Sequence, residues 1–290
     1  MFGKLLKHDF KAVFRYWWML LPSVPAVCIG LGLAFRFLYT YESPQRGFPL
    51  LELLVMLFMI FAIIALSASV LVTPILSLVR FYKHLYTDEG YLTFTLPVRR
   101  SALLMSKLVN ALIFDAMYAC LLGLSVSAAV LIAVPGDVIS AFFRGVSDLF
   151  RYYSDLFRYY PDLWQYSFWS ILFILELILL AIAVDLFTNL LLYFSVTIGA
   201  LIVKKAKLVV GLAIYYGTNT VLSWVTNILS YVILPFTLSE IVILAGGMSP
   251  HAALGILALM LLIGIAIVAT LAFTLYSLTL GRLQRSLNLA

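Results

Sequence analysis

The chain has 290 residues, of which 64% are hydrophobic and only 11% are charged, whereas soluble domains are about half apolar and about one-quarter charged. This composition excludes an ordinary soluble domain and indicates an integral membrane protein. The formal net charge of +6 does not require a nucleic-acid partner, because the Lys and Arg residues follow the expected membrane topology.

Six stretches are long and apolar enough to cross a bilayer, which takes about 20 residues. They cover residues 16–35, 53–79, 108–134, 167–203, 208–234 and 252–278. We therefore predict an all-α integral membrane protein with six transmembrane helices, in one domain over residues 16–290. Few residues are left over for a soluble catalytic domain.

The distribution of Lys and Arg predicts the orientation of the chain. With the N-terminus inside, 14 of the 19 Lys and Arg residues lie in the cytoplasmic segments and five lie on the outer side. Short cytoplasmic loops of membrane proteins carry this excess of positive charge. Both termini are therefore expected in the cytoplasm.

The first 15 residues have the pattern of an amphipathic helix. Phe2, Leu5, Leu6, Phe10 and Val13 share one face, and the basic residues of the segment share the other. Such a helix lies along the inner surface of the membrane, with its cations near anionic headgroups. We expect it to precede the first span.

The loop between the second and third spans, residues 80–107, combines cations with many aromatic and aliphatic residues. Its spacing predicts a short helix at 80–86 that ends near Gly90, and a second helix that begins near Ser101 after Pro97. A solvated basic loop would satisfy the charge rule. The apolar content instead favours a surface that docks on another protein.

An outer segment, residues 137–166, contains a repeated heptad, SDLFRYYSDLFRYY, and the start of a third copy. A helix here carries an aromatic and aliphatic stripe at Leu149, Tyr153, Leu156, Tyr160 and Leu163. A ladder of alternating charge lies beside it, at Asp148, Arg151, Asp155, Arg158 and Asp162. The segment fits a cap in the outer interface, a coiled contact with a second copy, or a tandem duplication without a function.

Three acids lie inside predicted spans: Asp115, Glu176 and Asp185. A charge in hydrocarbon is costly, so each must face protein or water. Glu176 and Asp185 are on opposite faces of one helix and cannot form a close pair. A structural hydrogen bond and a role in a polar pathway or in conformational coupling are both open for each acid.

The fourth stretch is too long for one crossing and too short for two, so we predict one long helix that extends into the cytoplasm. The fifth span carries a polar stripe, which faces either a subunit interface or a pathway. Its members are Tyr216, Asn219, Thr220, Ser223, Thr226, Asn227 and Ser230. Residues 235–251 are too short to cross and are interrupted by Pro and Gly, which predicts a re-entrant or interfacial segment on the outer side.

The motifs of several enzyme classes are absent from the sequence. It has no GxxxxGK[ST] loop for nucleotide phosphates, no HExxH, no GxSxG and no Cys/His spacing for a metal. Its two cysteines, Cys28 and Cys120, lie in predicted spans and suggest no disulfide framework. We expect no enzymatic activity, although an intramembrane enzyme would be possible if two of the three acids formed a close pair.

The loop sequence FYKHLYTDEGYLTFTLPV, followed by SALLMSKL, resembles the same segment in permease subunits of bacterial type-two ATP-binding-cassette (ABC) exporters. The opening GKLLKHDFKA, the six-span plan, the Lys-rich loop after the fourth span and the apolar loop before the sixth are also similar. The resemblance implies that the loop is a coupling helix, with a docking surface at Tyr82, Leu85, Tyr86, Asp88, Glu89 and Gly90.

The resemblance further implies a cytoplasmic ATPase that binds ATP and Mg²⁺, a second copy or paralogue of the permease, and a location in the bacterial plasma membrane. The chain itself is expected to bind no cofactor and no metal. The function implied is outward movement of amphipathic or hydrophobic cargo, with peptides favoured, by alternating access. The outer segment 137–166 departs from the family, and a contact with the transported molecule is a further interpretation of it. The competing interpretation is a membrane immunity or scaffold protein that binds a peptide without transporting it.

Overall fold

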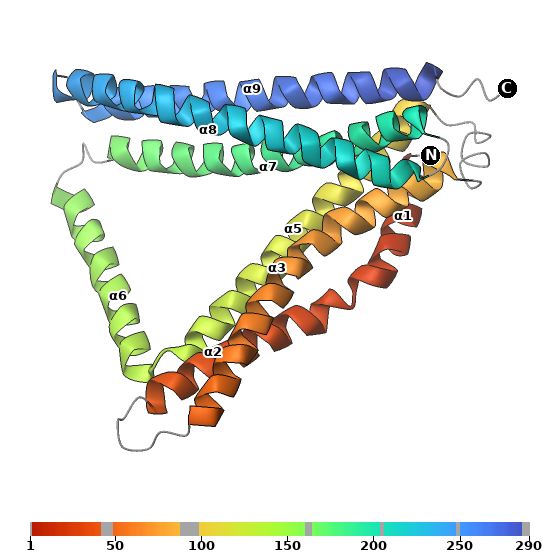
Figure 1. Ribbon diagram of the computed structural model, residues 1–290. Coiled ribbons are helices and arrows are strands. Elements are labelled where there is room, and N and C mark those ends of the chain that lie inside the picture. Colours follow the sequence, from red (N-terminus) through yellow and green to blue (C-terminus); the bar gives the residue numbers. More distant parts are fainter. Residues whose placement is uncertain are drawn as a thin grey trace. The chain divides into compact units, whose positions relative to one another are not determined.

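The computed structural model describes residues 2–41, 49–87, 99–159, 164–203, 206–247 and 250–285, and all its regular elements in these ranges are helices. Figure 1 shows their order along the chain. The helices are α1 (Phe2–Trp17), α2 (Leu20–Tyr41), α3 (Pro49–Tyr86), α5 (Arg100–Ala133), α6 (Gly136–Tyr159), α7 (Trp164–Ile202), α8 (Lys207–Gly247) and α9 (Pro250–Arg285).

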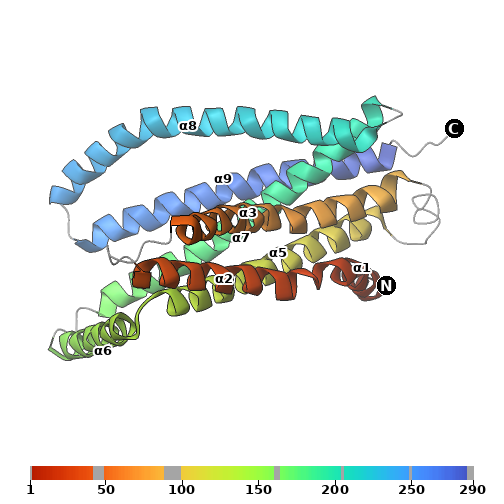
Figure 2. The same cartoon turned by 60° about the horizontal axis from the view of Figure 1, so that its bottom comes forward.

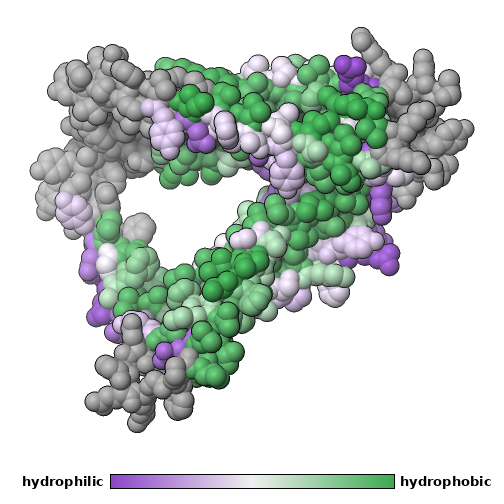
Figure 3. Space-filling model, viewed as in Figure 1, coloured by the Kyte–Doolittle hydropathy of each residue, from purple (hydrophilic) through white to green (hydrophobic). Residues whose placement is uncertain are grey.

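Six helical segments among the described residues are long and apolar enough to cross a membrane. They are Phe2–Thr40, Leu50–Tyr86, Arg100–Ala133, Ile171–Ile202, Lys207–Ile228 and Gly255–Leu283. Apolar side chains cover much of the surface of these helices, as Figure 3 shows for one face. An all-helical fold with six helices that could span a membrane is therefore confirmed, and the predicted interfacial, re-entrant and coupling helices stay predictions.

Two predicted boundaries differ from the structure. Residues 80–86 are the last turns of α3 and not a separate short helix. Residues 235–247 continue α8 without a break, because a proline removes only one backbone hydrogen bond and a membrane helix can tolerate it. By contrast, the long fourth helix is present as α7, which has 39 residues.

The chain divides into two compact units, Met1–Arg80 with Val109–Asp155 and Phe81–Leu108 with Leu156–Ala290. In the first unit, α1 and α2 pack against α5 through an apolar cluster. The Phe114 ring on α5 lies 4.9 Å from the ring of Phe10 and 5.8 Å from that of Trp17. Cys28 and Tyr118 extend this cluster toward the middle of the spans.

In the second unit, α7 packs against both α9 and α8. Figure 1 shows the three helices as neighbours, and Figure 2 shows that α8 meets α7 at the ends next to their connecting loop and diverges from it farther along. Trp169 near the start of α7 meets Gly255 near the start of α9. Farther along, Leu190 of α7 and Tyr276 of α9 line one groove, so the two helices run parallel. Every seventh residue of α7, at 169, 176, 183 and 190, therefore faces α9.

Candidate functional site

The C-terminal end of α3, where the predicted coupling loop begins, is attached to α7. The hydroxyl of Tyr86 donates a hydrogen bond to Oγ1 of Thr197 at 2.9 Å. One turn earlier on α7, the ring of Tyr193 stacks on that of Phe81, with centroids 4.2 Å apart and an interplanar angle of 9°. Phe81 and Thr197 are fully buried. The two contacts fix the end of α3 on one face of α7.

The start of α5, where the same loop ends, meets the same part of α7. The hydroxyl of Tyr193 donates to the backbone oxygen of Lys107 at 3.4 Å. Arg100, in the first turn of α5, donates from Nη1 to the carbonyl of Leu283 on α9 at 2.8 Å. Both sides of the predicted coupling loop are therefore held by side-chain hydrogen bonds within the second unit.

The predicted docking residues fall into two groups. Tyr82 and Tyr86 are half-buried and their rings stack on each other, while Leu85 is buried. These three side chains therefore make contacts within the chain, and their contact with a partner protein stays a prediction. Asp88, Glu89 and Gly90 lie outside the described residues.

Helices α7 and α8 cross closely at Gly199 and Gly211, near the helix ends that flank the Lys-rich loop. A Cβ added at Gly199 would lie 2.5 Å from the backbone nitrogen of Gly211, and one added at Gly211 would lie 2.7 Å from Cα of Val196. Real Cβ atoms do not approach backbone this closely, so both positions need glycine. The crossing lies within one turn of Thr197 and of the contacts with α3.

The polar stripe of α8 is exposed in this chain at every position whose side chain the structure describes. Its hydroxyl groups donate to carbonyls of their own helix, from Thr220 to Tyr216 at 2.7 Å and from Ser223 to Thr220 at 2.9 Å. Such local bonds satisfy a hydroxyl donor without water. The amide of Asn219 is exposed as well, and the side chain of Ser230 lies outside the described residues. The exposure is compatible with both predicted roles, a subunit interface and a pathway.

Of the three acids in the predicted spans, Glu176 is the most completely buried. Its side chain is 1% exposed, and neither carboxylate oxygen has a hydrogen-bond partner. It occupies the face of α7 that meets α9, where residues 255–269 of α9 contain no polar side chain. An unpartnered polar group in such a place lowers stability.

The other two intramembrane acids have partners. Asp185 accepts a hydrogen bond from Nδ2 of Asn189 at 3.1 Å, and Asp115 is half-buried and also in contact with other groups. Glu176 and Asp185 are separated by nine residues of continuous helix, or roughly 14 Å. These two do not form the close pair that an intramembrane enzyme would need.

We expect Glu176→Leu to raise the free energy of unfolding, because it removes an unsatisfied buried group and keeps a similar volume. The expected gain is about 1–3 kcal/mol, measured as a higher thermal unfolding midpoint in detergent. Glu176→Gln keeps polar atoms in the same place and should gain less. A Leu variant less stable than the parent would mean that the carboxylate has a stabilising partner in the assembled protein.

Three members of the two predicted stripes have described side chains in α6, and Leu149, Asp148 and Arg151 are all exposed. Phe142, Phe143 and Tyr152, which lie outside those stripes, are each more than half exposed as well. From residue 153 onward the side chains lie outside the described residues. The structure therefore leaves a cap, a contact with a second copy and a contact with cargo all open.

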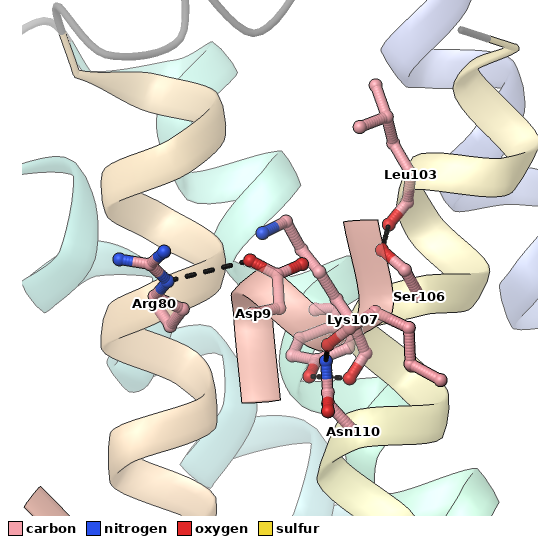
Figure 4. Close-up of polar contacts among 8 residues, drawn as sticks. Asp9, Arg80, Leu103, Ser106, Lys107 and Asn110 are labelled. Atoms are coloured by element: carbon pink, nitrogen blue, oxygen red, sulfur yellow. Dashed lines mark hydrogen bonds and ion pairs between the residues drawn. The ribbon is translucent and has the colours of Figure 1, made fainter. Parts of the chain in front are cut away.

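A buried ion pair that was not predicted from the sequence joins Asp9 of α1 to Arg80 of α3. The Asp9 side chain is 5% exposed, and its Oδ1 lies 3.6 Å from Nε of Arg80, as Figure 4 shows. On α5, Nδ2 of Asn110 donates to the carbonyl of Leu6 at 3.3 Å. These contacts attach α1 to both α3 and α5. A signal existed in the sequence, since Asp9 is four residues from both Leu5 and Val13 and so lies on the apolar stripe.

No protein-family model matches this chain, and comparisons with curated proteins and with solved structures find no match. The resemblance to ABC permeases therefore stays an interpretation of the sequence. Among the residues that the structure describes, no group of three or more His, Cys, Asp or Glu could hold a metal ion. The arrangement that most needs a functional explanation is the attachment of the helices on both sides of the predicted coupling loop to α7.

Proposed function

We propose that this protein is the membrane-spanning permease subunit of an ABC exporter. The observation that carries the proposal is the pair of contacts from the end of α3 to α7, Tyr86 to Thr197 and Phe81 to Tyr193. The helix before the loop contacts α7 through Phe81 and Tyr86, and the helix after it accepts a hydrogen bond from Tyr193, so a displacement of the loop can be transmitted to α7. A solvated basic loop would need none of these contacts with α7.

The mechanism follows these contacts through the second unit. Closure of an ATPase displaces residues 88–98, and the displacement reaches α7 through Phe81 and Tyr86. The backbones of α7 and α8 are in direct contact where Gly199 crosses Gly211, so a shift of α7 also displaces α8. The polar stripe of α8 then changes its position at the subunit interface or pathway, which is alternating access.

The partners in this proposal are two cytoplasmic ATPase subunits and a second permease copy or paralogue. ATP and Mg²⁺ are bound by the ATPase, since the sequence has no phosphate-binding loop of its own. For the cargo we propose an amphipathic or hydrophobic peptide. The exposed aromatic side chains of α6 support a surface of that kind.

Co-purification with a candidate ABC ATPase, chosen for example from any that is encoded beside the gene, tests the proposal. Wild-type protein is expected to retain the ATPase in detergent and to stimulate ATP hydrolysis, and Tyr86→Ala/Glu89→Ala is expected to weaken both. If wild-type protein retains no ATPase, the exporter proposal fails and a peptide-binding scaffold becomes the better account.

A second pair of variants separates docking from coupling. Thr197→Val removes the acceptor of the Tyr86 hydroxyl and leaves the loop unchanged, so the ATPase should still bind while its stimulation falls severalfold. Thr197→Ser keeps the acceptor and should restore stimulation. Equal stimulation by the Val and Ser variants would show that this hydrogen bond takes no part in coupling.

A further inference from the structure

An apolar groove of about 520 Å³ lies in the second unit between α5, α7 and α9. Its wall includes Met105 of α5, Ala183 and Leu190 of α7, and Ala269 and Tyr276 of α9. Tyr276 carries the one hydroxyl group among the lining residues. The small side chains of the alanines create the hollow, because longer side chains at these positions would fill it.

The length of the groove is close to that of one lipid chain in one leaflet. It extends from Leu179 to Leu190 on α7 and from Ile265 to Tyr276 on α9, which is about 16 Å of helix in each case. One leaflet contributes about 15 Å of hydrocarbon. All three helices are candidate spans, so the groove is at the depth of lipid chains.

Cations gather at one end of the groove. Arg100 lies five residues before Met105 on α5, and Arg282 lies six residues after Tyr276 on α9, or about 8–9 Å along each helix. The hydrogen bond from Arg100 to the carbonyl of Leu283 holds these two helix ends together. The side chains of Arg282 and of Arg99 are exposed. By the charge rule this end is cytoplasmic, where anionic lipids are concentrated.

We propose that the groove binds one anionic phospholipid of the inner leaflet. An acyl chain fills the space beside Ala183 and Ala269, and the phosphate is held at the end marked by Arg100 and Arg282. Guanidinium groups bind phosphate oxygens through charge-assisted hydrogen bonds. This inference does not depend on the proposed transport function.

The charge at the end of the groove decides between a lipid and a second copy of the chain. A second copy inserted in the same orientation brings its own basic cytoplasmic ends to the same depth, so cations would meet cations. An anionic headgroup is complementary to them. The groove therefore favours a lipid over a helix of another subunit.

Native mass spectrometry of the detergent-purified full-length protein tests the site, with phosphatidylglycerol and phosphatidylcholine as probes. We expect wild-type protein to retain one phosphatidylglycerol, with at least tenfold weaker retention of phosphatidylcholine. Ala183→Phe fills the groove and should lose the bound lipid. Ala181→Phe is the matched control, because Ala181 is exposed on the same helix and lines no part of the groove.

Arg282→Ala tests the headgroup without altering the groove, and it should reduce the preference for phosphatidylglycerol severalfold. Ala269→Phe repeats the filling experiment from α9 in case Ala183→Phe does not fold. The proposal is overturned if both Phe variants retain phosphatidylglycerol as wild type does, or if the two lipids bind equally. It is also overturned if Ala183→Phe removes a dimer peak while no lipid is bound to wild-type protein, because the groove would then be a subunit contact.

Discussion

Asp9→Ala is expected to loosen α1 from the rest of the first unit and to lower the free energy of unfolding by about 2 kcal/mol. Removing one partner of a fully buried ion pair costs about 3–5 kcal/mol. The expected loss is smaller here because the Arg80 side chain is 24% exposed and its Nε is 3.6 Å from the carboxylate. Water can therefore solvate part of the charge that is left behind.

The reactivity of Cys28 gives a local measurement of this loosening. Cys28 is buried in the same apolar cluster as Val13 and Trp17 of α1, while Cys120 is exposed. In a Cys120→Ser background, a thiol-reactive dye should label Cys28 at a lower temperature in Asp9→Ala than in the parent. A global loss of structure would shift the labelling and the bulk unfolding together, so both are recorded.

Two controls separate the ion pair from a general effect of charge on α1. Lys11→Ala removes an exposed charge from the same helix and should change stability by less than about 0.5 kcal/mol. The exchange Asp9→Arg/Arg80→Asp restores an ion pair and should recover part of the loss. Equal labelling of Cys28 in Asp9→Ala and Lys11→Ala would show that the pair does not hold α1.

The sequence predicted those features of the fold that depend on local composition. Six apolar stretches became six candidate spans, and the uninterrupted fourth stretch became one helix, α7. The continuation of α8 beyond residue 235 was not predicted, since Pro and Gly in a membrane helix do not always end it. Composition gives the presence of a helix more reliably than its end.

The contacts of the candidate site could not be predicted in the same way. The aromatic residues near the loop were interpreted as a surface for a partner, whereas Phe81 and Tyr86 contact α7 within the chain. The two residues of each contact lie on two different helices, and the periodicity of one helix carries no information about its partner on another. Asp9 is an intermediate case, because its place on an apolar stripe signals a buried partner without identifying Arg80.

Substitutions at the crossing of α7 and α8 are expected to have large effects, because backbone packs directly on backbone there and the route proposed for coupling passes through it. Thr197 receives the hydrogen bond from Tyr86 two residues before Gly199. Motion of α7 can reach α8 at this point only while the two backbones stay in contact. A substitution that separates them should therefore lower both stability and coupling.

Gly199→Ala and Gly211→Ala are each expected to lower the free energy of unfolding by about 3 kcal/mol, the upper end of the cost of overpacking. The new Cβ atoms would lie 2.5 Å and 2.7 Å from backbone atoms, which cannot rotate away as a side chain can. The thermal unfolding midpoint in detergent should fall, and stimulation of the ATPase should fall with it.

Gly217→Ala is the matched control, because a Cβ at that position of α8 meets nothing within 4 Å. Alanine forms helix more readily than glycine by about 1 kcal/mol, so this variant should be as stable as the parent or more stable. The difference between Gly211→Ala and Gly217→Ala then isolates the helix contact from the backbone effect of replacing glycine. If the two variants unfold at the same temperature, α7 and α8 are not in tight contact at the crossing, and coupling must reach α8 by another route.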